Sequence, residues 1–318
     1  MDLTLSVIIL NWNAANDTIR CVRQLIAWQQ LRPAIWVVDN NSADNNADLI
    51  ARECPYVYLI RNPTNLGFAG GTNQGINASL AMGNWPILLL NNDAYIGEED
   101  VLRLLKTLQE NPDFGFVGPL LFDAEKKERL LSAGGKNPVL HHQTRVRTFS
   151  SGQPCQVVAN ISGTATLIRA EVFRQIGLLD EAYFFSTELA DLCARAKQGG
   201  YLSVIDTRAR AFHTLSRSSH FRNNLYPYYI IRNRFIYIRK FYRPGFKSLL
   251  LGSLLLGFWG AYSLLLSFKL YLSGQRPTAC AVRLGLIDGW QGRFYGQNER
   301  VLAACQNSSS WPIYGSDS

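Results

Sequence analysis

The stretch Pro86-Ile87-Leu88-Leu89-Leu90-Asn91-Asn92-Asp93 is an uncharged apolar run that ends abruptly in two amides and a carboxylate. Such a run is too short for an independent helix, and it predicts a covered strand of a mostly parallel sheet. Open α/β sheets bind ligands at the carboxyl ends of their strands. Asp93 is therefore placed to hold a divalent cation against a phosphate, with Asn91 and Asn92 as neutral donors and acceptors beside it. The alternative is a strand-end Asp that only satisfies a turn.

Polar residues also follow the first two predicted strands. Asn11 and Asn13 follow the first, and Asp39 and Asn41 follow the second. The apolar pattern predicts strands over 5–10, 35–38 and 56–60, with helices over 17–28 and 45–53 between them. This alternation predicts right-handed βαβ units whose ligand site lies at the strand ends.

A glycine-rich segment, residues 62–75, follows the third predicted strand and leads into a helix. Glycines allow a backbone to approach a phosphate or a base closely, and a helix N-terminus favours an anion. A dinucleotide-binding fingerprint does not fit, because the segment follows the third strand and has no G-x-G-x-x-G. Close helix packing is the alternative to ligand binding. The residues of this segment that we expect to bind such a ligand are Asn65, Gly67, Gly70, Gly71 and Asn73.

Two carboxylates occur at a predicted helix start near the middle of the chain. Thr187 is a plausible N-cap, and Glu188, Asp191 and Arg195 share one helical face. Carboxylates in such a position can act as general bases. The alternative is an acidic helix start that complements the dipole and forms an internal ion pair.

Four motifs carry a resemblance to a known family. They are Val7-Ile8-Ile9-Leu10-Asn11-Trp12-Asn13, Val37-Val38-Asp39-Asn40-Asn41-Ser42, Asn65-Leu66-Gly67-Phe68-Ala69-Gly70-Gly71-Thr72-Asn73-Gln74-Gly75 and Leu89-Leu90-Asn91-Asn92-Asp93. In this order they resemble the family 2 inverting glycosyltransferases with a GT-A fold, and the rhamnosyltransferase-like branch most. The resemblance covers residues 4 to 240, and it implies an α/β fold with a mostly parallel nucleotide-binding sheet flanked by helices.

The resemblance also implies roles at the donor. Asp39 corresponds to the residue that reads the nucleotide base or ribose. Asp93 corresponds to the last carboxylate of the metal-binding D-x-D motif, which implies a divalent cation, Mg²⁺ or Mn²⁺; Asn91 stands where that motif often has its first Asp. Gly163 lies in a segment similar to the one that lines the donor sugar. His213, beyond a strand predicted over 201–205, resembles a late histidine that approaches the metal or the diphosphate.

The resemblance further bears on the base. The family usually has E-D-x-D-L-x-x-R, and here Leu189 stands at the second position. Glu188 is therefore the predicted base, with Asp191 as second choice or as the partner of Arg195.

The C-terminal third is basic, aromatic and then strongly apolar. The chain has 318 residues and a net charge of +8. Residues 223–241 predict an amphipathic helix on a membrane surface, and residues 248–268 contain no charged side chain. As a helix, such a run has the length of a bilayer's hydrocarbon core, so it predicts a membrane segment that spans or lies in the interface. A basic, aromatic flank before an apolar run is typical of membrane proteins, so no nucleic-acid partner is expected.

The sequence thus predicts a catalytic domain over 1–222, membrane-associated helices over 223–305 and a disordered tail over 306–318. Because the N-terminus lacks a cleavable signal, the catalytic domain is expected on the cytoplasmic face of the membrane. The predicted reaction is metal-assisted, inverting transfer from dTDP-rhamnose or a UDP-sugar to a hydroxyl of a lipid-linked or cell-surface polysaccharide acceptor. The alternatives are an inactive membrane-tethered nucleotide-sugar-binding protein, which Leu189 suggests, and a nucleotidyltransferase, which lacks its expected glycine-rich loop here.

Overall fold

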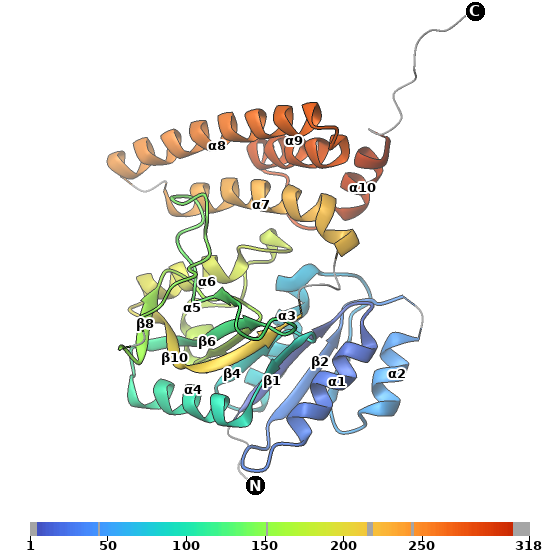
Figure 1. The fold of residues 1–318 in the computed structure, drawn as a ribbon, viewed down its shortest axis with the longest axis vertical. Coiled ribbons are helices and arrows are strands. Elements are labelled where there is room, and N and C mark those ends of the chain that lie inside the picture. The colour runs from blue at the N-terminus through green and yellow to red at the C-terminus, as the bar shows by residue number, and fades with distance from the viewer. Residues whose placement is uncertain (1–4, 44, 151, 215–218, 243–244, 308–318) are drawn as a thin grey trace, which may run out of the picture. The chain divides into compact units, whose positions relative to one another are not determined.

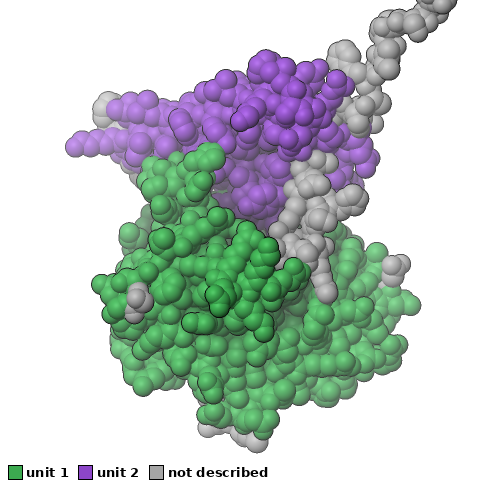
Figure 2. Space-filling model, in the orientation of Figure 1, with its two compact units in different colours: residues 1–184, 188–215 green, residues 185–187, 216–318 purple. Residues whose placement is uncertain are grey.

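The computed structural model describes residues 5–43, 45–150, 152–214, 219–242 and 245–307. The chain divides into two compact units, residues 1–184 with 188–215 and residues 185–187 with 216–318 (Figure 2). Of the tail predicted over 306–318, residues 308–318 lie outside the described residues, and the last helix ends at Asn307.

Unit 1 is built on one ten-stranded sheet of order β3-β2-β1-β4-β9-β6-β10-β5, with β7 beside β6 and β8 beside β10. The pairings from β3 to β4 are parallel, as predicted, and from β9 onward the sheet is mixed. The strands are β1 Ser6–Asn11, β2 Ala34–Asp39, β3 Tyr58–Arg61, β4 Ile87–Leu90, β5 Ala94–Ile96, β6 Phe114–Asp123, β7 Leu130–Ser132, β8 Cys155–Val158, β9 Ala165–Ile168 and β10 Leu202–His213.

Helices cover both faces of this sheet (Figure 1). Alternate residues of β1 enter two different cores, because successive strand side chains point to opposite faces. Val7 and Ile9 belong to the core that includes α1 and α4, and Ile8 belongs to the core that includes α3, α5 and α6. The helices of unit 1 are α1 Ala15–Ile26, α2 Asn46–Glu53, α3 Gly67–Met82, α4 Glu98–Glu110, α5 Ala170–Ile176 and α6 Glu188–Gln198, with a 3₁₀ turn at Glu181–Tyr183.

The parallel strands deliver their polar ends to one edge of the sheet. Asn11 at the end of β1 lies in register with Asp39 at the end of β2. The loop after β4 carries Asp93, and β4 is parallel to β1. The strand predicted over 201–205 extends to His213, because its second half pairs antiparallel with β5, a short strand not predicted from the sequence.

Unit 2 contains α7 Ser219–Phe241, α8 Phe246–Leu272, α9 Arg276–Gln291 and α10 Asn298–Asn307. The prediction that 223–241 forms a surface helix is wrong for its central turns, because Arg232, Asn233 and Phe235 are fully buried. Tyr228 of α7 also donates a 2.6 Å hydrogen bond to the buried Asp288 of α9. Helix α7 is therefore a packing element of unit 2.

Helix α8 is, within the described residues, the one helix long and apolar enough to span a membrane, and 22% of its most apolar stretch is buried. A stripe that includes Leu255, Trp259 and Ser263 is buried. The guanidinium of Arg234 on α7 lies 3.9 Å from the Trp259 ring centroid. Large apolar side chains cover much of the remaining surface of α8: Leu249, Leu250, Leu251, Leu254, Phe258, Leu264, Leu265, Phe268, Tyr271 and Leu272 are exposed.

Candidate active site

Asp39 is held rigidly at the end of β2. Its Oδ1 accepts a 2.7 Å hydrogen bond from the Asn11 amide, and its Oδ2 accepts one of 3.2 Å from the Ser42 backbone N–H. Asn11 is fully buried and Asp39 nearly so. These two donors fix the plane of the carboxylate, so its remaining acceptor capacity points in a defined direction.

A chain of hydrogen bonds connects this pair to the loop after β4. Thr18 donates to Asn11 Oδ1 at 2.7 Å, and Asn92 donates to the Thr18 hydroxyl at 3.0 Å. The structure thus brings together Asp39, Asn11 and Asn92 from three strand ends, as the sequence predicted. Sequence reasoning missed Thr18, because a hydroxyl on a helix carries no signal of a long-range partner.

Asn13 and Asn41 shape the two loops at this edge. Both adopt the left-handed conformation, with φ of 54° and 60°, which Asn tolerates better than most residues. The side chain of Asn13 accepts a 2.7 Å hydrogen bond from Ala43 N–H, and its backbone N–H donates to Ser42 at 2.8 Å. Their direct contact with a donor stays a prediction.

The glycine-rich segment packs the start of α3 tightly. A Cβ on Gly70 would lie 2.8 Å from Leu66 Cβ, and one on Gly71 would lie 2.6 Å from Leu10 Cδ1. These distances account for both glycines through packing alone. A role for them in donor binding stays a prediction.

The two asparagines of the segment have different partners. Asn65 Oδ1 accepts hydrogen bonds from Asn40 at 2.9 Å and from Gly67 N–H at 2.8 Å, so it closes the loop before α3. Asn73 is buried and binds Leu179 through both its amide groups, at 2.9 and 3.1 Å, and donates to Glu181 at 3.0 Å. Asn73 therefore ties α3 to residues 179–181, and none of these hydrogen bonds, among the described residues, reaches the Asp39 network.

We expect Gly67→Ala to destabilise unit 1. Gly67 has a φ of 74°, and a Cβ there would lie 2.4 Å from the Phe184 carbonyl oxygen, which is closer than nonbonded atoms approach. Backbone strain and this clash together cost on the order of 2–3 kcal/mol. Thermal unfolding measures the loss; Gly152→Ala, where a Cβ meets no atom within 4 Å, is the control. Equal unfolding temperatures for the two variants would contradict the expectation.

Asp93 and His213 meet at the far side of the same edge. β5 begins directly after Asp93 and aligns Ala94 with His213 on β10. The Nε2 atom of His213 lies 3.0 Å from Asp93 Oδ1, and both side chains remain partly accessible, at 10% and 20%. Carboxylate and imidazole together suit Mn²⁺ better than Mg²⁺, which prefers oxygen ligands. Asn91 is oriented by its backbone, whose N–H donates to Thr164 O at 2.9 Å.

Two protein ligands leave most of a cation's coordination shell open. Among the described residues, no group of three or more His, Cys, Asp or Glu side chains lies close enough to hold a metal ion. Asp93 and His213 therefore fit a cation whose other ligands are phosphate oxygens and water.

Glu188 and Asp191 are both buried at the start of α6, but they differ in their hydrogen-bond partners. Asp191 is completely buried; its Oδ1 accepts from the Tyr183 hydroxyl at 3.1 Å and its Oδ2 from Arg195 Nε at 2.7 Å. Arg195 in turn donates to the carbonyls of Ile176 and Leu178. Asp191 therefore fits the alternative role of structural partner to Arg195.

Glu188 is buried, with 7% exposure, and its Oε2 has no hydrogen-bond partner among the described residues. Burial raises the pKa of the Glu188 carboxyl to about 7; its own backbone N–H opposes this shift, and the negative charge of Asp191 adds to it. A carboxyl with its pKa near neutrality and a free oxygen is suited to accept a proton.

Leu189 packs where the family pattern has an acid. Its side chain is buried in the core that contains Leu192. A Cβ on Gly163 would lie 3.3 Å from both Leu189 Cδ2 and Phe68 Cζ. Glycine at position 163 therefore leaves room for these two apolar side chains. Position 189 therefore supports the helix and offers no proton acceptor.

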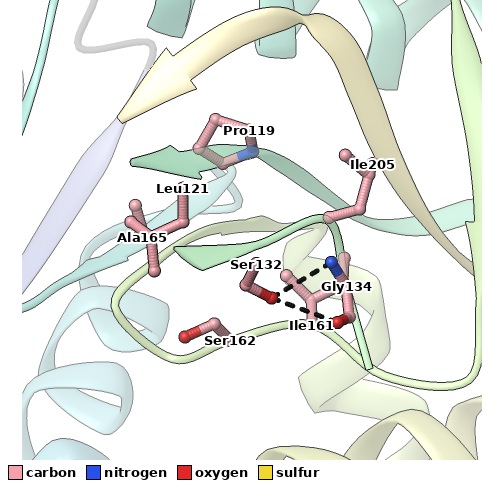
Figure 3. A pocket seen from close by; sticks show the side chains of 8 residues that line it. All are labelled: Pro119, Leu121, Ser132, Gly134, Ile161, Ser162, Ala165 and Ile205. Atoms are coloured by element: carbon pink, nitrogen blue, oxygen red, sulfur yellow. Dashed lines mark hydrogen bonds between the residues drawn. The ribbon is translucent and has the colours of Figure 1, made fainter. Parts of the chain in front are cut away.

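A small pocket is lined by residues of β6, β7, β9 and β10 and of the adjoining loops, and Figure 3 shows its lining. Its walls are mostly apolar, and the Ser132 hydroxyl pairs with both backbone groups of Gly134, at 3.1 and 3.2 Å. None of the predicted site residues lines the pocket. We assign it no part in the reaction.

Comparison with known proteins identifies the fold and the family of this chain. The mannosyltransferase PcManGT from Pyrobaculum calidifontis, solved with GDP-Man and Mn²⁺, is similar with a TM-score of 0.58 and 12% identity, over 91% of this chain and 88% of that one. The fold is thus that of a GT-A glycosyltransferase, as predicted. The glycosyl transferase family 2 model matches residues 6–177, more than half of the chain. The chain belongs to this family, and the protein is a glycosyltransferase.

Two curated relatives support the resemblance seen in the sequence. The low-salt glycan biosynthesis hexosyltransferase Agl10 of Haloferax volcanii is 26% identical over 249 residues, 73% of this chain and 74% of the relative. The N-acetylglucosaminyl-diphospho-decaprenol L-rhamnosyltransferase of Mycobacterium tuberculosis is 26% identical over 212 residues, 58% of this chain and 68% of the relative. The predicted likeness to the rhamnosyltransferase branch is confirmed.

Proposed function

We propose that this glycosyltransferase moves a sugar, with inversion, from dTDP-rhamnose or a UDP-sugar to a hydroxyl of a lipid-linked or cell-surface glycan. The observation that carries the proposal is Glu188, a buried carboxyl with one oxygen unpartnered among the described residues at the start of α6. The mycobacterial relative, whose name specifies rhamnosyl transfer to N-acetylglucosaminyl-diphospho-decaprenol, supports the choice of a rhamnosyl group and of a lipid-linked acceptor.

The reaction requires two things of the protein: that it positions the donor and the acceptor, and that it accepts one proton. Glu188 accepts the proton of the acceptor hydroxyl as that oxygen bonds to the anomeric carbon. The bond from this carbon to the donor phosphate breaks on the opposite side, and its electron pair leaves with the nucleoside diphosphate. Asp39, held by Asn11 and Ser42, binds the nucleoside.

Asp93 and His213 would hold a Mn²⁺ or Mg²⁺ ion at the donor diphosphate. Such an ion supplies positive charge that stabilises the departing diphosphate. The separation of 3.0 Å between Asp93 Oδ1 and His213 Nε2 and their partial exposure support this assignment.

A donor screen tests the function. We expect dTDP-rhamnose or one UDP-sugar to raise the unfolding temperature of the full-length protein, and more so with Mn²⁺ present. The same donor should then be consumed when a polyprenyl-diphosphate-linked sugar is added. Donor binding without turnover on any such acceptor would contradict the proposal.

We further propose that unit 2 anchors the enzyme to the cytoplasmic face of a membrane. From residue 216 to residue 287 the sequence has eleven Lys or Arg and no Asp or Glu; apart from the buried Arg232 and Arg234, this excess of positive charge suits an anionic surface. The exposed leucines and aromatics of α8 supply the apolar contact.

We expect Leu250→Glu, Leu254→Glu and Leu265→Glu together to release the protein from membranes. All three side chains are exposed, so the changes remove apolar area from contact with lipid and leave the packed stripe of α8 intact. Sedimentation with anionic vesicles measures the loss. The matched control adds the same charge at Gln109, Ser150 and Gln153 on the exposed surface of unit 1. Continued sedimentation of the α8 variant would remove this helix from the anchor.

A further inference from the structure

The turn that leads into Glu188 is strained. Phe184, Ser186 and Thr187 have φ values of 61°, 68° and 77°. Side chains such as these disfavour the left-handed region, and for a bulky or β-branched residue it is a genuine outlier. Such strain persists only where surrounding contacts enforce it. The turn leads directly into Glu188, the residue proposed as the base, so the conformation of the turn sets where α6 begins.

Two sets of hydrogen bonds hold this turn. At its first residue, the Phe184 carbonyl accepts from Phe68 N–H at 2.6 Å and Ala69 N–H at 3.4 Å, both at the start of α3. At its next two residues, the carbonyls of Phe185 and Ser186 accept from one group, the Asn233 amide, at 2.9 and 2.7 Å. Residues 185–187 belong to the same compact unit as Asn233.

Arg232 fixes the orientation of the Asn233 side-chain amide. Arg232 donates from Nε and Nη2 to Asn233 Oδ1, at 3.0 and 2.9 Å. Because a guanidinium only donates, the oxygen must face Arg232 and the NH₂ must face the turn. Both residues are fully buried. Arg232 is itself held over the rings of Tyr228 and Tyr229, with its guanidinium 5.5 and 4.6 Å from their centroids.

Aromatic packing secures the same turn. The Phe185 ring meets Tyr226 and Tyr229 edge to face, at centroid distances of 6.3 and 6.2 Å. Tyr229 thus contacts both Phe185 and Arg232. The turn is therefore built into α7 through backbone and side-chain contacts.

We propose that Asn233, oriented by Arg232, is a positioning residue that holds the strained 184–187 turn and so places the Glu188 carboxylate for catalysis. The inference rests on the proposed function of Glu188. Asn233 does not itself need to touch the donor or the acceptor.

Asn233→Asp is the principal test, because it keeps the acceptor for Arg232 and removes the donor to the two carbonyls. We expect kcat to fall on the order of 100-fold, with the donor KM changed less than about twofold, since misplacement of a reacting group affects the chemical step. Ser267→Ala is the control: it removes a 2.9 Å hydrogen bond from the Ser267 hydroxyl to the Ala279 carbonyl in the same unit, away from the turn. Full activity of Asn233→Asp would overturn the proposal.

A second substitution tests whether the effect passes through backbone strain. Glycine adopts positive φ without cost, so Ser186→Gly should make the turn less dependent on the amide. We expect Asn233→Asp with Ser186→Gly to recover about tenfold of the lost kcat. A folded double variant with no recovery would overturn the proposal. If the Asp variant does not fold, Asn233→Ala with and without Ser186→Gly provides the same comparison.

A measurement without turnover separates this inference from the proposed function. In the wild-type background, Glu188→Gln should raise the unfolding temperature at pH values above about 7, the pKa of Glu188. At pH values near 4.5 it should have no such effect, because only the ionised buried carboxylate is unfavourable. With Asn233→Asp this difference should shrink as the carboxylate gains water. Persistence of the full difference would overturn the positioning role, whereas a wild type without transferase activity would overturn only the function.

Discussion

Glu188→Gln is expected to lower kcat on the order of 1000-fold, within the range that a general base contributes. Its Oε2 has no other partner among the described residues, so the amide should fit the same space. Donor affinity should stay unchanged, because the proposed role of the carboxyl is to act on the acceptor hydroxyl. Single-turnover kinetics and donor titration by calorimetry separate the two quantities.

The pH profile gives an independent check of the same residue. Burial raises the pKa of Glu188 to about 7, so below this pH the carboxyl is protonated and accepts no proton. The kcat of the wild type should therefore rise with pH to a plateau above about 7, and the residual rate of Glu188→Gln should lack this limb.

Stability has the opposite dependence on pH. The unfolded carboxyl loses its proton near 4.5 while the folded one retains it to about 7, so wild-type stability falls across this window and is constant above it. Glu188→Gln removes this fall. Melting curves of both proteins across the window measure it.

Asp191→Asn is the matched comparison for the base assignment. Arg195 loses a buried charged partner, so the variant is expected to be less stable by about 3 kcal/mol. If Asp191→Asn folds normally and loses turnover while Glu188→Gln keeps it, the two roles are reversed.

Asp93→Asn is expected to lower metal-dependent turnover on the order of 100-fold. The substitution removes the negative charge that would face a bound cation and leaves the backbone hydrogen bond from Thr214 N–H to Asp93 O intact. Donor binding should lose its dependence on Mn²⁺, which a titration of donor affinity against Mn²⁺ measures. Asp113→Asn, at an exposed position of unit 1, is the control.

His213→Ala should have a smaller effect than Asp93→Asn, because a neutral ligand contributes less charge. If Asp93→Asn keeps its full Mn²⁺-dependent turnover, Asp93 does not belong to the metal site.

The sequence by itself determined the class of fold and one edge of the site. Short apolar runs that end in polar residues predict buried strands, and parallel strands bring their carboxyl ends to one edge. That geometry is why Asn11, Asp39 and Asn92 could be grouped before any coordinates. The match of four motifs in order to a family added the expected chemistry.

Only the tertiary structure decided which side chains pair. Asp93 meets His213 because β5 reverses direction and lies along the end of β10, and local periodicity does not encode such a long-range pairing. Glu188 and Asp191 share a helical face in the sequence, yet their hydrogen-bond partners differ. Tyr183 and Arg195 both donate to Asp191, whereas Oε2 of Glu188 has no partner among the described residues.

The same reason explains the mistake over α7. Its basic and aromatic composition favours a membrane surface, whereas Arg232 and Asn233 are buried because aromatic rings and backbone carbonyls satisfy them. The stretch Leu88–Asp93 predicted an acid at a strand end from local pattern alone. The partner of Asp93, and the contacts that hold the turn before Glu188, involve residues far away in the chain, which only folding brings together.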